Sequence, residues 1–338
     1  MDAETGLYPW LADPWHTLSA HVNAGRVPQA LLIQGAAGIG KLRLAELFAQ
    51  RLLCQRPGEF ACEACPACRL FLAGTHPDFI KVWPPEPGKV IGVDAIRQLI
   101  SELALKSQFD SYRVVIIAPA HAMNISASNA LLKTLEEPAE RTVMLLLSEA
   151  PASLPATILS RCQRLPVAAP DSESACRWLE ARQPGCGPAT LLAAARGSPL
   201  KALALAGTDV TERRRTVFGE WSGVLLGREE PVAVAARWES QAHEEFVDWM
   251  LTWTMDLIRL LSAPGCGRLC NPDLREDLRT LSRRLHLPGL FDHWSLTLSS
   301  RRALSGQSNR LLLLEELLIR WARLGRASES GATQRGKP

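Results

Sequence analysis

Apolar residues in the first half of the chain alternate between short continuous runs and stretches with helical spacing. Such runs are typical of strands buried on both faces, and they cover 30–34, 79–83 (with Lys81 as an interruption), 113–118 and 142–148. Between these runs, apolar residues recur three and four positions apart, which predicts helices over 42–53, 93–105 and 128–137. Strands that alternate with helices in this way predict a parallel sheet with helices on both faces.

The second half of the chain has helical spacing only. Short helices are expected over 172–182 and 188–206, with a break at Gly197-Ser-Pro199, and longer ones over 212–226, 233–261, 273–285 and 311–324. We interpret the tryptophans among them as the core of a helix bundle, namely Trp238, Trp249, Trp253, Trp294 and Trp321. Residues 328–338 are small and polar, and we expect them to be disordered.

Composition narrows the class of protein. The 338 residues suffice for two or three domains, and 47% apolar with 22% charged residues is ordinary for a globular protein. A formal charge of +3 is too small to predict nucleic-acid binding by itself. No apolar run approaches the ~20 residues that cross a membrane, and the acidic start at Asp2 and Glu4 does not resemble a secretory signal. A cytoplasmic location is therefore expected, where clustered cysteines favour a metal site over disulfides.

The first predicted strand runs into a glycine-rich loop. Gly35-Ala-Ala-Gly-Ile-Gly-Lys41 fits the pattern G-x-x-x-x-G-K between a strand and a helix. In such a loop Gly35, Gly38 and Gly40 allow backbone N–H groups to surround phosphates, and Lys41 reaches the terminal phosphates. The alternative is a loop kept only as a structural turn, and the sequence leaves open whether Lys41 binds ATP weakly or not at all.

Several groups that ATP hydrolysis requires are missing. The residue after Lys41 is Leu42, where a serine or threonine hydroxyl would hold magnesium. The strand over 113–118 should end in carboxylates that bind magnesium and orient water, yet no Asp or Glu occurs from Arg113 to Leu135. Charge that develops on a transferred phosphate would therefore lack compensation within the chain. We expect no hydrolysis by the chain alone.

A cysteine cluster follows the glycine-rich loop. Cys54, Cys62, Cys65 and Cys68 are spaced C-x7-C-x2-C-x2-C, which suits a tetrahedral zinc ion. Since all the ligand positions are cysteines, no position remains for water, and the expected zinc is structural.

Several segments together resemble one family. They are Tyr8-Pro-Trp10, the glycine-rich loop, the cysteine cluster, Gly74-Thr-His-Pro-Asp78, Gly92-Val-Asp94, Asn129-Ala-Leu-Leu-Lys-Thr-Leu-Glu-Glu-Pro138, Ser160-Arg-Cys162 and Gly197-Ser-Pro199. Their order over residues 1–205 resembles the AAA+ clamp-loader family of the bacterial DNA polymerase III, and within it the delta-prime type. Beyond residue 208 the resemblance is limited to helical character and length.

The resemblance implies an α/β plus all-α architecture. It consists of a P-loop AAA+ domain over 1–167 with a zinc module over 54–68, a helical lid over 168–207 and a helical collar over 208–327. Such chains form hetero-pentamers with gamma/tau and delta subunits, and the complex loads a sliding clamp onto primer–template DNA as part of a DNA-directed DNA polymerase holoenzyme. ATP lies at subunit boundaries in these rings.

The resemblance also implies a role for Arg161. The arginine of Ser-Arg-Cys acts as an arginine finger in the ATP site of a neighbouring subunit, and a guanidinium suits this role because it is always charged and matches phosphate oxygens. Active relatives carry a phosphate-sensing arginine after Gly-Ser-x, where this chain has Leu200. We therefore expect a clamp-loader subunit without catalysis of its own. The alternatives are an active gamma/tau-like ATPase and a stand-alone zinc-bearing nucleic-acid-binding module.

Overall fold

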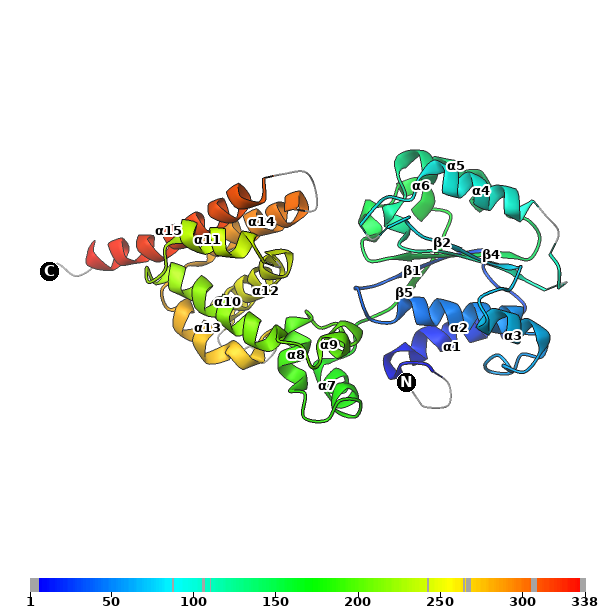
Figure 1. The fold of residues 1–338 in the computed structure, drawn as a ribbon, viewed down its shortest axis with the longest axis horizontal. Coiled ribbons are helices and arrows are strands. Elements are labelled where there is room, and N and C mark those ends of the chain that lie inside the picture. Colours follow the sequence, from blue (N-terminus) through cyan, green and yellow to red (C-terminus); the bar gives the residue numbers. More distant parts are fainter. Residues whose placement is uncertain are drawn as a thin grey trace. The chain divides into compact units, whose positions relative to one another are not determined.

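The computed structural model describes residues 6–86, 88–104, 107–109, 111–241, 243–263, 265, 269–304 and 309–334. The chain divides after Pro170 into two compact units (Figure 1). The first unit is α/β and the second contains helices only among its described residues. The separation of the second unit into a lid over 168–207 and a collar over 208–327 stays a prediction.

The first unit is built on a parallel sheet of five strands in the order β2-β3-β4-β1-β5. The strands are β1 (Ala30–Gln34), β2 (Phe79–Val82), β3 (Arg113–Ile117), β4 (Thr142–Ser148) and β5 (Gln163–Pro166). The four strands predicted from apolar runs are confirmed. The edge strand β5 was not predicted because only Leu165 is buried within it, so it has no apolar run.

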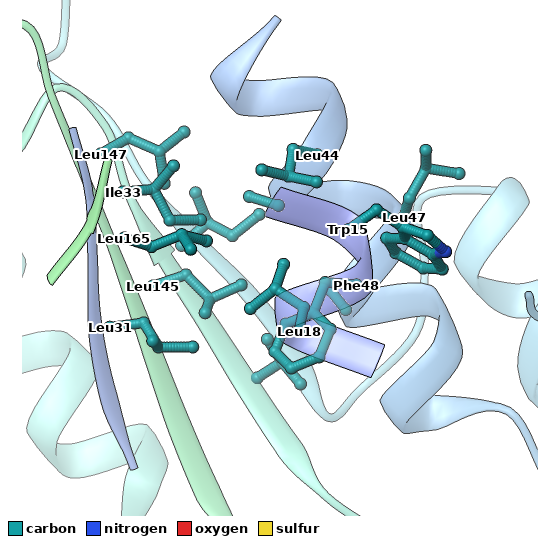
Figure 2. Close-up of a cluster of buried hydrophobic side chains, with 14 of the residues drawn as sticks. Trp15, Leu18, Leu31, Ile33, Leu44, Leu47, Phe48, Leu145, Leu147 and Leu165 are labelled. Carbon is teal, nitrogen blue, oxygen red and sulfur yellow. The ribbon is translucent and has the colours of Figure 1, made fainter. Parts of the chain in front are cut away.

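Helices cover both faces of this sheet (Figure 1). One face packs against α1 (Ala12–Asn23) and α2 (Lys41–Leu53). Figure 2 shows Leu31, Ile33 and Leu145 pointing from this face toward Leu18 and Phe48. Alternate strand residues form a second core with α4 (Val93–Leu103), α5 (Ile125–Glu136) and α6 (Ala156–Leu159). The prediction of a sheet covered on both faces is confirmed.

Proline and capping residues decide several helix starts. Helices α1 and α3 (Pro66–Leu72) were not predicted, and both carry a proline in the first turn, where no intrahelical hydrogen bond is lost. Helix α5 begins before the predicted Ser128, because the Asn124 side chain accepts a hydrogen bond from the Ala127 N–H at 2.8 Å. The predicted end of α4, Leu105, lies outside the described residues.

Short 3-10 helices occur at Pro9–Leu11, Ala120–Ala122, Pro151–Ser153 and Pro272–Leu274.

The second unit contains α7 (Ser172–Glu180), α8 (Pro188–Ala194), α9 (Pro199–Leu205), α10 (Val210–Leu225), α11 (Pro231–Glu239), α12 (His243–Ser262), α13 (Arg275–Ser282), α14 (Leu287–Leu304) and α15 (Arg310–Gln334). The expected break at Gly197-Ser-Pro199 is confirmed. The pattern over 233–261 was wrongly expected to be one helix, since α11 ends at Glu239 and α12 begins at His243. Helix α14 was not predicted, because polar residues interrupt its apolar spacing.

Helix α15 corrects the expected disorder from residue 328. It continues to Gln334, and the last four positions, 335–338, lie outside the described residues. Glu329, Ala332 and Gln334 in this segment are compatible with a helix, and no proline interrupts it before Pro338.

Tryptophans form the centre of the second unit, as predicted. Trp238, Trp249, Trp253 and Trp321 are fully or almost fully buried. Trp221 stacks on Trp321 with ring centroids 4.2 Å apart. Trp294 was wrongly placed in the core and is only partly buried, since the buried side chains of α14 lie at other positions.

Candidate functional site: a phosphate cradle, a surface arginine and a cysteine cluster

The glycine-rich loop joins β1 to α2 and has the shape of a phosphate cradle. Gly38 and Gly40 have φ angles of 65° and 91°, and Gly40 precedes the first residue of α2. A Cβ atom at Gly40 would lie 2.5 Å from Cδ2 of Tyr8, so only glycine fits there. Trp10 donates a hydrogen bond from Nε1 to the Ile39 carbonyl at 2.8 Å. The N-terminal segment thereby supports the loop that carries Lys41.

The Lys41 side chain lies inside this cradle. Its Nζ donates to the Ala36 carbonyl at 2.6 Å and lies 3.7 Å from Oε1 of Glu149. Only 7% of the side chain is exposed. Burial lowers the pKa of Lys41, and the neighbouring Glu149 carboxylate opposes that shift. The loop residues predicted as a nucleotide site are thus brought together, with a carboxylate that the sequence analysis did not include.

The positions that should hold magnesium carry no oxygen ligand. Leu42 offers only a hydrocarbon side chain, 37% exposed. Strand β3 lies beside β4 and ends at Ile117, followed by Ala118 and Pro119. Beyond them, His121 Nδ1 lies 3.2 Å from the Ser148 hydroxyl. Burial lowers the pKa of His121, although Glu149 opposes this effect.

Arg161 follows α6 and is held at the surface. Its Nε donates to Oε1 of Glu136 at 2.7 Å, and its Nη2 forms an ion pair with the same oxygen. Its Nη1 donates to the Thr157 carbonyl at 2.9 Å. The Arg161 side chain remains 32% exposed. Glu136 was missed as a functional candidate, because its partner is twenty-five positions away in the sequence.

Leu200 stands where a phosphate-sensing arginine is expected in active relatives, and it lies in the second unit. Leu200 is in the first turn of α9, and Ser198 caps this helix by accepting a hydrogen bond from the Lys201 N–H at 3.3 Å. The side chain at position 200 is apolar and partly buried, so it cannot bind phosphate.

The cysteine cluster joins the end of α2 to the start of α3. The sulfur atoms of Cys54, Cys62, Cys65 and Cys68 all lie within 4.8 Å of one another. Ligands of a tetrahedral Zn–S4 site are separated by about 3.8 Å, so these residues can hold such an ion. The N–H groups of Ala64 and Cys65 lower the pKa of Cys62 to about 6, which favours a thiolate ligand, whereas burial raises the pKa of Cys68.

Among the described residues, no helix combines the length and the apolar character that a bilayer crossing requires. The parallel sheet, the glycine-rich loop before α2 and the following helical unit together define a P-loop protein of the AAA+ type.

Comparison with known proteins gives the family. A family model described as "DNA polymerase III, delta subunit" matches residues 11–171, and one described as "DNA polymerase III, delta subunit, C terminal" matches residues 210–323. The chain belongs to the family of DNA polymerase III delta' (delta-prime) subunits. It is 36% identical over 324 residues to the delta' subunit of Pseudomonas aeruginosa, covering 94% of this chain and 98% of that protein.

Other proteins similar to this chain are also named as subunits of DNA polymerase III. The delta' subunit of Escherichia coli is 33% identical over 328 residues, covering 93% of this chain and 94% of that protein. The tau subunit of DNA polymerase III from Bacillus subtilis is 38% identical over 136 residues, which cover 40% of this chain and 24% of that protein. A crystal structure of a gamma subunit-related protein of DNA polymerase III from Thermotoga maritima has a TM-score of 0.44 at 17% identity, and covers 92% of this chain and 99% of that one.

Proposed function

We propose that this chain is a non-hydrolysing subunit of the DNA polymerase III clamp loader. It would work in a hetero-pentamer with gamma/tau and delta subunits, which loads the sliding clamp onto primer–template DNA. Family membership supports a place in this multi-subunit complex. The cradle supports the lack of hydrolysis, because Leu42 and Ala118 replace the oxygen ligands that magnesium needs.

Arg161 is proposed as an arginine finger for the ATP site of a neighbouring subunit. The main support for this role is that the Arg161 guanidinium is partly exposed and fixed at the end of α6. The phosphate cradle of the same chain lacks the expected metal ligands at Leu42 and Ala118. The pair with Glu136 and the hydrogen bond to the Thr157 carbonyl fix the side chain and limit the conformations it must lose on engaging a phosphate. A guanidinium supplied in this way stabilises charge on the transferred phosphate, typically by about 10³–10⁵-fold in rate.

The test compares variants in the reconstituted complex with DNA and clamp. Arg161→Ala should leave assembly intact and remove most hydrolysis at the subunit boundary that this chain completes. The total ATP turnover of the complex should fall by at least the contribution of that boundary. Arg161→Lys should rescue it poorly, since an ammonium lacks the planar fork. Arg97→Ala, which removes an exposed arginine on α4, is the matched control. Unchanged DNA-stimulated hydrolysis with Arg161→Ala would reject the finger role.

A second measurement tests the absence of hydrolysis. The purified chain alone should show no magnesium-dependent ATP turnover. Turnover at a motor-like rate would instead favour a gamma/tau-like ATPase.

The metal ion proposed for the cysteine cluster is a structural zinc ion. The four thiols would bind it as thiolates and leave no coordination position for water or substrate. Its task would be to tie the end of α2 to the start of α3, because Cys54 directly follows α2 and Cys65 directly precedes α3.

A further inference from the structure

The Lys41 ammonium already has an anionic partner within its own chain. In a working P-loop the lysine reaches the terminal phosphates of the nucleotide. Here Nζ is bonded to the Ala36 carbonyl at 2.6 Å and lies 3.7 Å from the Glu149 carboxylate. Only 7% of the Lys41 side chain is exposed. The Glu149 carboxylate is about as close to Nζ as a bound phosphate would have to be.

Strand pairing fixes the place of Glu149. Strands β1 and β4 are neighbours, and Gln34 pairs with Ser148, so the next residue of each strand enters the same edge of the sheet. The Gly35 N–H donates to the Ser148 carbonyl at 3.2 Å, which extends this pairing into the cradle. After Glu149, the Ala150 N–H donates to the Ser148 hydroxyl at 3.2 Å. The backbone on both sides of Glu149 is therefore held, and its carboxylate is directed to the loop.

We propose that Glu149 excludes phosphate from the cradle by acting as an internal counter-anion for Lys41. The inference rests on the proposed identification of residues 35–41 as a degenerate phosphate cradle, and it names the residue that closes it. A polyphosphate entering the loop would displace Glu149 from Lys41 and meet its negative charge at close range. Leu42 and Ala118 stand where magnesium ligands are expected and supply no oxygen, so these two positions cannot hold a cation that would offset this repulsion.

The experiment measures binding of inorganic pyrophosphate and of ATP, each without magnesium, to the isolated full-length chain by titration calorimetry. The unaltered chain should bind neither measurably at millimolar concentration. Glu149→Gln keeps the size of the side chain and removes its charge, so both ligands should bind measurably, with affinities at least about tenfold above the detection limit that applies to the unaltered chain. Glu149 is 46% exposed, so the variant should fold, and thermal unfolding verifies this.

Matched variants locate the binding. Glu149→Asp keeps the negative charge and should keep the cradle closed, while Glu137→Gln, an exposed glutamate after α5, should change nothing. Lys41→Met combined with Glu149→Gln should abolish the gained binding. Two outcomes would overturn the proposal. In the first, Glu149→Gln binds no more tightly than the unaltered chain. In the second, the gain in affinity survives the loss of Lys41. None of these outcomes bears on Arg161, whose role is tested by hydrolysis in the complex.

Discussion

At the residue scale, His293 is a buried ionisable group outside the cradle. It lies on α14 with 2% of its surface exposed, and neither ring nitrogen has a hydrogen-bond partner among the described residues. Its ring packs 4.9 Å from that of Trp321. Burial lowers the pKa of His293 from 6.5 to about 3, so between these values the unfolded chain binds a proton that the folded chain does not. Protonation therefore favours unfolding as the pH falls below about 6.5.

His293→Phe should remove this dependence. Between pH 7 and pH 5 the unaltered chain should lose about 2 kcal/mol more of its free energy of unfolding than the variant does. Urea unfolding at both pH values measures the difference. His16→Gln, which changes an exposed histidine of α1, serves as the control and should behave like the unaltered chain. Equal losses in His293→Phe and the unaltered chain would show that His293 is not buried in its neutral form.

At the scale of elements, the cysteine cluster connects two helices and positions the loop between them. Phe60, within this loop, stacks on Trp15 of α1 with ring centroids 4.7 Å apart. Cys65 also caps α3, since its sulfur accepts a hydrogen bond from the Cys68 N–H at 3.4 Å. Phe60 packs against the core that contains Trp15, but the buried members of both sheet cores come from outside residues 54–72. Loss of the metal should therefore loosen the module and leave the sheet folded.

Cys65→Ser tests this expectation, because serine preserves the helix cap and is a much weaker zinc ligand. Metal analysis should find about one zinc per unaltered chain and well below one in the variant. Hydrogen exchange should become faster over residues 54–72 and remain slow in β1, β3 and β4. Cys186→Ser, which alters a partly buried cysteine outside the cluster, should retain the metal. A variant with a full complement of zinc and unchanged exchange would refute the assignment.

At the scale of the whole molecule, each unit has its own buried core. Met1–Pro170 contains the sheet with hydrophobic side chains on both faces, and Asp171–Pro338 contains the tryptophan cluster. Domains of this size bury enough apolar surface to fold alone.

Separate expression of residues 1–170 and 171–338 should therefore give two folded fragments. The first should unfold cooperatively and contain zinc, and the second should show the circular dichroism of a helical protein. Calorimetry and metal analysis measure these properties. An unfolded or aggregated first fragment would show that its core needs the second unit.

Much of the fold follows from local patterns that the sequence carries by itself. Strands β1, β3 and β4 were predicted from continuous apolar runs, and β2 from a run that only Lys81 interrupts. The edge strand β5 was not predicted, because it buries only Leu165. The cysteine spacing was informative for a similar reason, since its members are close along the chain and must converge. The absence of magnesium ligands at Leu42 and Ala118 was also visible from residue types alone.

The partners of the charged groups were decided only by the tertiary structure. Glu149 reaches Lys41 because β4 pairs with β1, and this strand order is not written in any local pattern. Glu136 reaches Arg161 because α5 and α6 lie on the same face of the sheet. Apolar periodicity is a property of neighbouring residues, and it specifies elements. Ion pairs between elements depend on the order and register in which the elements pack, and so they appear only when the chain is folded.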